Sequence, residues 1–100
     1  MSTLHIINKE PRSTVFSNCS KAISAKDSII LIENGVHALL DKDWLNDLAQ
    51  RENANPCYAL NPDIEARGLI NITRGLNITC IDYREFVELC TQHERTVSWL

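Results

Sequence analysis

The stretch Ser28-Ile29-Ile30-Leu31-Ile32-Glu33 decides the fold class of this chain. It carries four large apolar residues in a row, three of which are β-branched, and this composition favours a β-strand. A half-exposed strand would alternate apolar and polar residues, whereas this stretch offers apolar side chains to both faces. Such strands are typical of parallel sheets that helices cover on both sides. The stretch therefore predicts a buried strand in an α/β fold.

Segments on both sides of this stretch alternate between strand and helix patterns. Further strands are expected at residues 4–7, 57–60, 76–81 and 96–100, where apolar and β-branched residues cluster. Between the strands, apolar residues recur at intervals of three and four, as in amphipathic helices. The residues expected to begin these helices are Ser13 or Ser17, Asp43, Asn61 with Pro62, and Asp82 with Glu85.

This alternation predicts one three-layer, flavodoxin-like α/β domain with a mostly parallel sheet over residues 1–100. Right-handed crossovers leave few topologies, and we favour the strand order 2-1-3-4 with the C-terminal strand at an edge. Ligands bind such sheets where the strand order reverses, so the expected site positions are residues 8–12 and 61–63. The dipeptide Asn34-Gly35 fits a hairpin turn on local grounds, but the helix-favouring residues after it favour a turn from strand into helix.

The composition bounds the class of protein. With 44% apolar and 23% charged residues in a chain of 100, it is that of an ordinary soluble globular protein. The longest apolar run, residues 29–32, is far too short to cross a bilayer, and the N-terminus shows no basic leader with a long apolar centre. We therefore expect a cytoplasmic protein without membrane contact. A net charge of -3 with scattered Lys and Arg predicts no direct binding to nucleic acid.

The residue types that build metal and nucleotide sites are present but widely spaced. The cysteines form no C-x-x-C pair, the histidines lack the spacing of paired metal ligands, and the three glycines form no phosphate-binding loop. Neither a metal nor a cofactor is expected. The histidine at position 5 lies in a predicted strand and is interpreted as a satisfied sheet residue, not as a base. These cysteines and histidines are Cys19, Cys57, Cys80 and Cys90, and His5, His37 and His93.

Cys19 is the one cysteine with a functional interpretation. It lies on the predicted helix after the first strand, and a thiol near the positive end of a helix has its thiolate favoured. Cys19 also shares an apolar stripe with Phe16 and Ile23, so packing in the core explains it without any reactivity. The other three cysteines are interpreted as structural.

Five stretches, in order along the chain, resemble the TusB/DsrH family. They are Leu4-His5-Ile6-Ile7-Asn8-Lys9, Leu31-Ile32-Glu33-Asn34-Gly35-Val36-His37-Ala38, Tyr58-Ala59-Leu60-Asn61-Pro62-Asp63-Ile64-Glu65-Ala66-Arg67-Gly68-Leu69, Ile81-Asp82-Tyr83 with Phe86-Val87, and Ser98-Trp99. No single stretch is diagnostic, but together they span nearly the whole chain.

The resemblance implies a flavodoxin-like subunit of a heterohexamer that also contains TusC/DsrF-like and TusD/DsrE-like sister chains. In the Tus system such a complex passes persulfide sulfur from a TusA-like donor to a TusE-like acceptor, for 2-thiolation of the wobble uridine of transfer RNA. The Dsr version belongs to sulfur oxidation.

The resemblance also implies where a sulfur-carrying thiol would lie. In the TusD/DsrE-like sister, that cysteine ends the third strand, a few residues before an Arg-Gly pair like Arg67-Gly68. This chain reads Leu60-Asn61-Pro62 there, which predicts an accessory subunit that is not an enzyme by itself.

Two alternatives stay open. Cys19 matches a cysteine of DsrH-type members, which implies a persulfide sulfurtransferase acting in sulfur oxidation. A small ligand-binding flavodoxin-like domain, with a pocket at the strand reversal, is a third and weaker interpretation.

Overall fold

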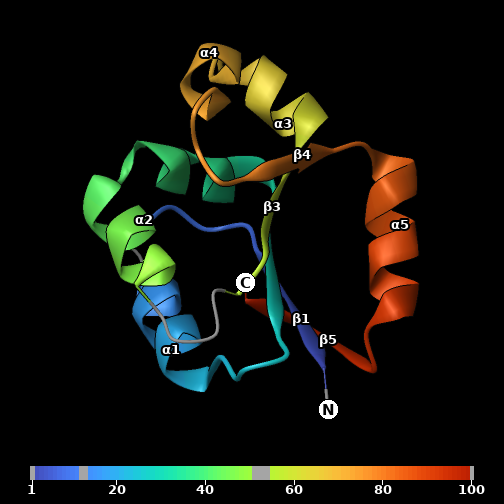
Figure 1. Cartoon of the computed structure of the whole chain (residues 1–100). Helices are drawn as coiled ribbons and strands as arrows, with labels where there is room; N and C mark the ends of the chain where they lie inside the picture. The colour runs from blue at the N-terminus through green and yellow to red at the C-terminus, as the bar shows by residue number, and fades with distance from the viewer. Residues whose placement is uncertain (1, 12–13, 51–54, 100) are drawn as a thin grey trace.

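A five-stranded parallel sheet forms the centre of the protein, in a computed structural model that describes residues 2–11, 14–50 and 55–99. Each neighbouring pair of strands is parallel, and the order is β4-β3-β2-β1-β5 (Figure 1). The strands are β1 (Thr3–Ile7), β2 (Ser28–Leu31), β3 (Cys57–Leu60), β4 (Thr79–Ile81) and β5 (Arg95–Trp99). The predicted α/β class with a parallel sheet is thereby confirmed.

The expected strand order 2-1-3-4 is wrong, although the C-terminal strand does lie at an edge. The chain steps in one direction from β1 to β4 and then returns across the sheet to place β5 beside β1. The order therefore reverses between β1 and β5. β2 separates β1 from β3, so residues 8–11 and 61–63 do not flank a common reversal point as expected. Arg12 lies outside the described residues.

Helices cover the two faces unequally. The helical segments are α1 (Thr14–Ala22), the 3-10 segment η1 (Glu33–Leu40), α2 (Lys42–Ala49), α3 (Asn61–Ala66), α4 (Ile70–Thr73) and α5 (Tyr83–Gln92). Right-handed crossovers that step in one direction keep their helices on one face, and the returning crossover places its helix on the other. Figure 1 accordingly shows α1 and α2 on one side of the sheet and α5 on the opposite side.

Several helix boundaries differ from the expected ones. Asp41, not Asp43, caps α2, because its side chain accepts the N–H of Trp44 at 3.1 Å. Ser17 lies inside α1, while Ser13 is outside the described residues. α3 begins at Asn61, after Leu60.

Asp82 and Glu85 do form the capping box of α5. In this motif, the Glu85 N–H donates to the Asp82 side chain at 2.8 Å, and the Asp82 N–H donates to the Glu85 carboxylate at 3.3 Å. The Asn34-Gly35 pair belongs to η1, so the turn leads from strand into helix as the sequence favoured.

Two apolar clusters pack on the two faces of the sheet. The larger lies on the face covered by α1 and α2 and contains Phe16, Cys19 and Leu48. The smaller lies under α5 and contains Leu4, Ile30 and Leu89 among others. Strand β2 is buried over its whole length, as expected for a central strand. None of the described helices is both long enough and apolar enough to span a membrane.

Candidate functional site

Cys19 lies in the second half of α1. It is the sixth residue of a helix that begins at Thr14 and ends at Ala22. The positive end of a helix dipole acts on groups at its first turn. The dipole therefore does not favour a thiolate at Cys19, in contrast to the effect expected from the sequence.

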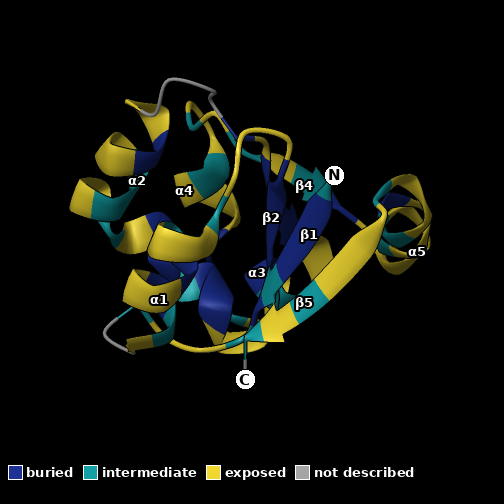
Figure 2. Ribbon diagram, turned by 90° about the horizontal axis from the view of Figure 1, so that it is seen from below, coloured by how far each residue is buried: buried dark blue, intermediate teal, exposed yellow. Residues whose placement is uncertain are grey.

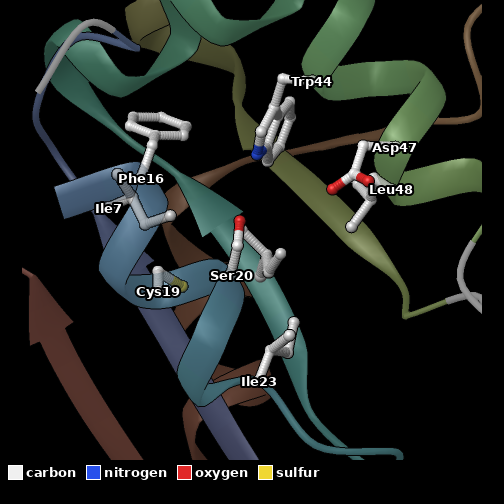
Figure 3. Close-up of a pocket in the computed structure, with 9 residues that line it drawn as sticks. Ile7, Phe16, Cys19, Ser20, Ile23, Trp44, Asp47 and Leu48 are labelled. Carbon is white, nitrogen blue, oxygen red and sulfur yellow. The ribbon is translucent and has the colours of Figure 1, made fainter. Parts of the chain in front are cut away.

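The side chain of Cys19 borders a narrow pocket between α1 and α2. Figure 3 shows side chains of the two helices facing one another across it. Cys19 is 2% exposed, and the rings of Phe16 and Trp44 meet edge to face beside it with centroids 5.4 Å apart. The free volume is about 10 Å³, roughly the least that holds one water molecule. A sulfur donor reaches Cys19 only if α1 and α2 separate. The pocket is lined by Ile7, Phe16, Cys19, Ser20, Ile23, Ile29, Trp44, Asp47 and Leu48.

A second thiol, Cys57 of β3, packs in the same apolar cluster as Cys19. Burial, and to a lesser degree the charge that a Cys19 thiolate would carry, raise the pKa of Cys57 to about 12. Burial also raises the pKa of Cys90. Thiolates are the reactive form of cysteine, and a raised pKa keeps both side chains mainly protonated at neutral pH. No disulfide joins the four cysteines, all of which the structure describes.

The carboxyl end of β3 is the position to which the resemblance assigns the sulfur-carrying cysteine of the sister chain. In this chain the residues there are an asparagine and a proline. β3 ends at Leu60 and is followed directly by Asn61 and Pro62, the first residues of α3. Asn61 is exposed. Without a thiolate, this turn has no nucleophile able to accept sulfur.

A polar cluster fixes this turn against the start of η1, which follows β2. The backbone N–H of Glu33 donates to Asp63 Oδ2 at 2.8 Å, and Glu33 itself has a left-handed backbone with φ of 49°. The guanidinium of Arg67 donates through Nη2 to Asn34 Oδ1 at 2.9 Å and through Nη1 to the Asp63 carbonyl at 3.2 Å. The residues singled out by the family resemblance thus hold two neighbouring turns together.

A buried chain of hydrogen bonds, which the sequence did not suggest, links β5, β1 and the start of β2. Trp99 Nε1 donates to His5 Nδ1 at 3.0 Å, and His5 Nε2 lies 2.8 Å from Asp27 Oδ2. An indole N–H can only donate, so Nδ1 of His5 is the acceptor and the imidazole proton lies on Nε2, which donates to Asp27. Both ring nitrogens are occupied, so His5 is a satisfied sheet residue, as interpreted from the sequence, and is not placed to act as a base.

Asp27 is the anchor of this cluster. It is 3% exposed and also accepts the backbone N–H groups of Thr3 at 3.0 Å and Ser24 at 2.9 Å. Burial by itself would raise the pKa of Asp27. The hydrogen bonds from His5, Ser24 and Thr3 outweigh that effect and hold the pKa of Asp27 below its ordinary value of 3.8.

The lowered pKa of Asp27 predicts a loss of stability in acid. Because the folded protein binds this proton less readily than the unfolded chain, the contribution of Asp27 is complete above pH 3.8 and is lost as the pH falls through the lowered folded pKa. Urea unfolding of the wild type and of Asp27→Asn, from about pH 6 down to about pH 2, measures this contribution. The difference in free energy of unfolding should shrink with falling pH; a constant or growing difference would contradict the assignment.

The other two histidines, His37 and His93, do not lie in a catalytic or metal-binding group of side chains. His37 Nδ1 lies 3.8 Å from Glu10 Oε1 at the surface, a distance typical of a weak exposed ion pair. His93 contacts the Leu89 carbonyl and the Ser28 hydroxyl, at 2.8 and 2.9 Å, and so ties α5 to β2. Among residues 2–11, 14–50 and 55–99, no three His, Cys, Asp or Glu side chains are grouped to hold a metal ion.

A family model and individual protein sequences both match most of this chain. A family model described as DsrH like protein matches residues 9–96. Protein TusB of Shigella dysenteriae serotype 1 is 35% identical over 97 residues, which cover 96% of this chain and 99% of the relative. Protein TusB of Escherichia coli strain K12 is 34% identical over the same shares of the two chains.

A solved structure has a similar fold. The solution structure of protein Tm0979 from Thermotoga maritima superposes with a TM-score of 0.63 and 26% sequence identity. The superposition covers 92% of this chain and 94% of the other.

Proposed function

Because this chain belongs to the DsrH-like family, we propose that it is an accessory, non-catalytic subunit of a heteromeric sulfur-relay complex. The observation that carries the proposal is the end of β3, where this chain has Asn61 and Pro62 at the position to which the resemblance assigns the sister chain's thiol. Burial of Cys19 at 2% exposure supports the same conclusion.

The complex we propose is a heterohexamer with TusC/DsrF-like and TusD/DsrE-like sister chains in the cytoplasm. Sulfur enters it as a persulfide from a TusA-like donor and leaves to a TusE-like acceptor, for 2-thiolation of the wobble uridine of transfer RNA. The sister chain supplies the thiolate, and this chain supplies a surface on which the assembly forms. This chain itself touches neither nucleic acid nor membrane.

A second candidate function places Cys19 in the relay, as in sulfur oxidation. Cys19 borders the pocket between α1 and α2, and a donor would reach it only where these two helices separate. In that reaction, the Cys19 thiolate would attack the outer sulfur of a donor persulfide. A new S–S bond would form on Cys19 as the donor's S–S bond broke and the donor left as a thiolate.

Substitution of Cys19 separates the two functions. We expect Cys19→Ala to lower the free energy of unfolding by about 1 kcal/mol, because it removes one small buried group, and to leave sulfur relay by the assembled complex unchanged. Cys19→Ser should cost more, about 1 to 3 kcal/mol, because it buries a hydroxyl in an apolar cluster. Relay rates and chemical unfolding of both variants measure these effects.

The wild-type chain alone, incubated with a persulfide donor, should keep its mass. If the isolated chain instead gains sulfur on Cys19, and relay stops in Cys19→Ala, the accessory role is wrong and the Cys19-dependent transferase is correct.

A further inference from the structure

Strand β5 is one of the two edges of the sheet, and no other described strand pairs with its outer side. Figure 2 shows it at the rim, largely exposed, beside the buried strand β1. The opposite edge strand, β4, has three residues, whereas β5 has five and runs alongside the whole of β1. Proteins commonly protect a long edge with proline, a bulge or several charges. β5 reads Arg-Thr-Val-Ser-Trp and contains no proline and a single charge.

Within the described part of the chain, the backbone groups of β5 that face away from β1 belong to Thr96 and Ser98. The backbone N–H of Arg95 donates to the Ser2 carbonyl on the β1 side. Successive residues of a strand direct their N–H and C=O groups to alternate sides, so Val97 and Trp99 also face β1, while Thr96 and Ser98 face outward. Any strand added at this edge must therefore hydrogen-bond to the backbone groups of these two residues, which sets its register.

That register is self-complementary. If a second β5 runs antiparallel with the two-fold axis at Val97, Thr96 lies opposite Ser98 of the other copy, and the reverse pair forms symmetrically. Each is a hydrogen-bonded pair that exchanges two N–H···O bonds, and Val97 meets its own copy in the non-hydrogen-bonded position between them. The outward N–H and C=O groups of β5 can therefore all pair with those of a second β5.

The side chains suit this pairing as well. Arg95 lies opposite Trp99 of the other copy, and directly opposed side chains on one face of an antiparallel pair lie close enough to interact. Arg and Trp form a cation–π contact when they meet in this way. On the other face, the hydroxyls of Thr96 and Ser98 meet, a pairing that stabilises antiparallel strands.

We infer that two copies of this chain pair through β5, in antiparallel register about Val97, to form one continuous sheet. This interface goes beyond the proposed function and does not depend on the sister chains. Its surface is distinct from the turns at the end of β3.

The isolated full-length chain tests the inference by sedimentation velocity across a wide concentration range. The wild type should sediment as a dimer that dissociates on dilution. Ser98→Pro removes an outward N–H that the β1 ladder does not use, a place where an edge strand tolerates proline. It should weaken the dimer at least about tenfold, since two intermolecular hydrogen bonds are lost, one for each Ser98 N–H. Ser98→Ala keeps the N–H and loses only the hydroxyl pairing with Thr96, so it should weaken the dimer far less than Ser98→Pro does. Circular dichroism should show the same fold in both variants.

Substitution of Val97, at the two-fold axis, by residues of opposite charge gives a second test that does not depend on proline. Val97→Lys and Val97→Glu should each be monomeric, because each sets two like charges opposite one another. Mixed in equal amounts, they should form a heterodimer, because opposite charges then meet.

A wild type that stays monomeric at all concentrations would overturn the inference. So would a Ser98→Pro dimer as tight as that of Ser98→Ala, or a Lys and Glu mixture that stays monomeric. Protection of the Thr96 and Ser98 amides from hydrogen exchange only after sister chains are added would also overturn it, because a sister chain would then be the occupant of the edge.

Discussion

Asp27→Ala should be among the most damaging single substitutions in this protein, with a loss of about 3 to 5 kcal/mol in the free energy of unfolding. The substitution removes the acceptor of three donors, the Thr3 N–H, the Ser24 N–H and His5 Nε2. Each buried donor left without an acceptor costs about 1 to 3 kcal/mol. Urea unfolding at neutral pH measures the loss.

The matched control is Asp47→Ala, which truncates an exposed carboxylate on α2. It should change the free energy of unfolding by about 0.5 kcal/mol or less. Tryptophan fluorescence, to which Trp44 and Trp99 both contribute, gives a second readout, because the Trp99 indole loses a fixed partner once His5 is no longer held by Asp27. Equal losses for the two alanine variants would show that the buried cluster contributes nothing particular to stability.

Gly35→Ala should have the second large effect, about 3 kcal/mol or more. A Cβ atom on Gly35 would lie 2.2 Å from the carbonyl oxygen of Ile7 and 3.0 Å from its carbonyl carbon. That oxygen already accepts the N–H of Ile32 at 3.0 Å, so it cannot shift without breaking the junction of β1 and β2. Insertion of a carbon into such a contact forces the backbone to move, which commonly costs 1 to 3 kcal/mol and sometimes more.

Gly75→Ala is the control for this substitution. No atom lies within 4 Å of a Cβ placed there, and its φ of 83° is the one source of strain. The expected cost is about 1 kcal/mol, the penalty for a left-handed alanine. Thermal unfolding of both variants compares the two effects, and a Gly75→Ala loss as large as that of Gly35→Ala would rule out the steric explanation.

The sequence predicted the elements of the fold better than their arrangement. The apolar run at residues 29–32 identified a parallel sheet because its local composition reports burial on both faces. Strand order depends on contacts between segments far apart in the chain, which no local pattern determines. β2, with every residue buried, holds the central position, while the exposed Thr96 and Ser98 mark β5 as an edge.

The candidate site was predicted in part, for a comparable reason. Cys19 was placed correctly on the apolar face of the first helix, because helical periodicity is local. The cluster of His5, Asp27 and Trp99 was missed. Its partners are separated by 22 and 94 residues, and no local pattern reports such contacts.

Co-expression with TusC/DsrF-like and TusD/DsrE-like chains, followed by size-exclusion chromatography, tests the accessory-subunit role most directly. The account predicts that this chain co-elutes with both sisters in one large assembly, and that Cys19→Ala assembles equally well. Elution of this chain apart from both sisters, as a stable species of its own, would contradict the account.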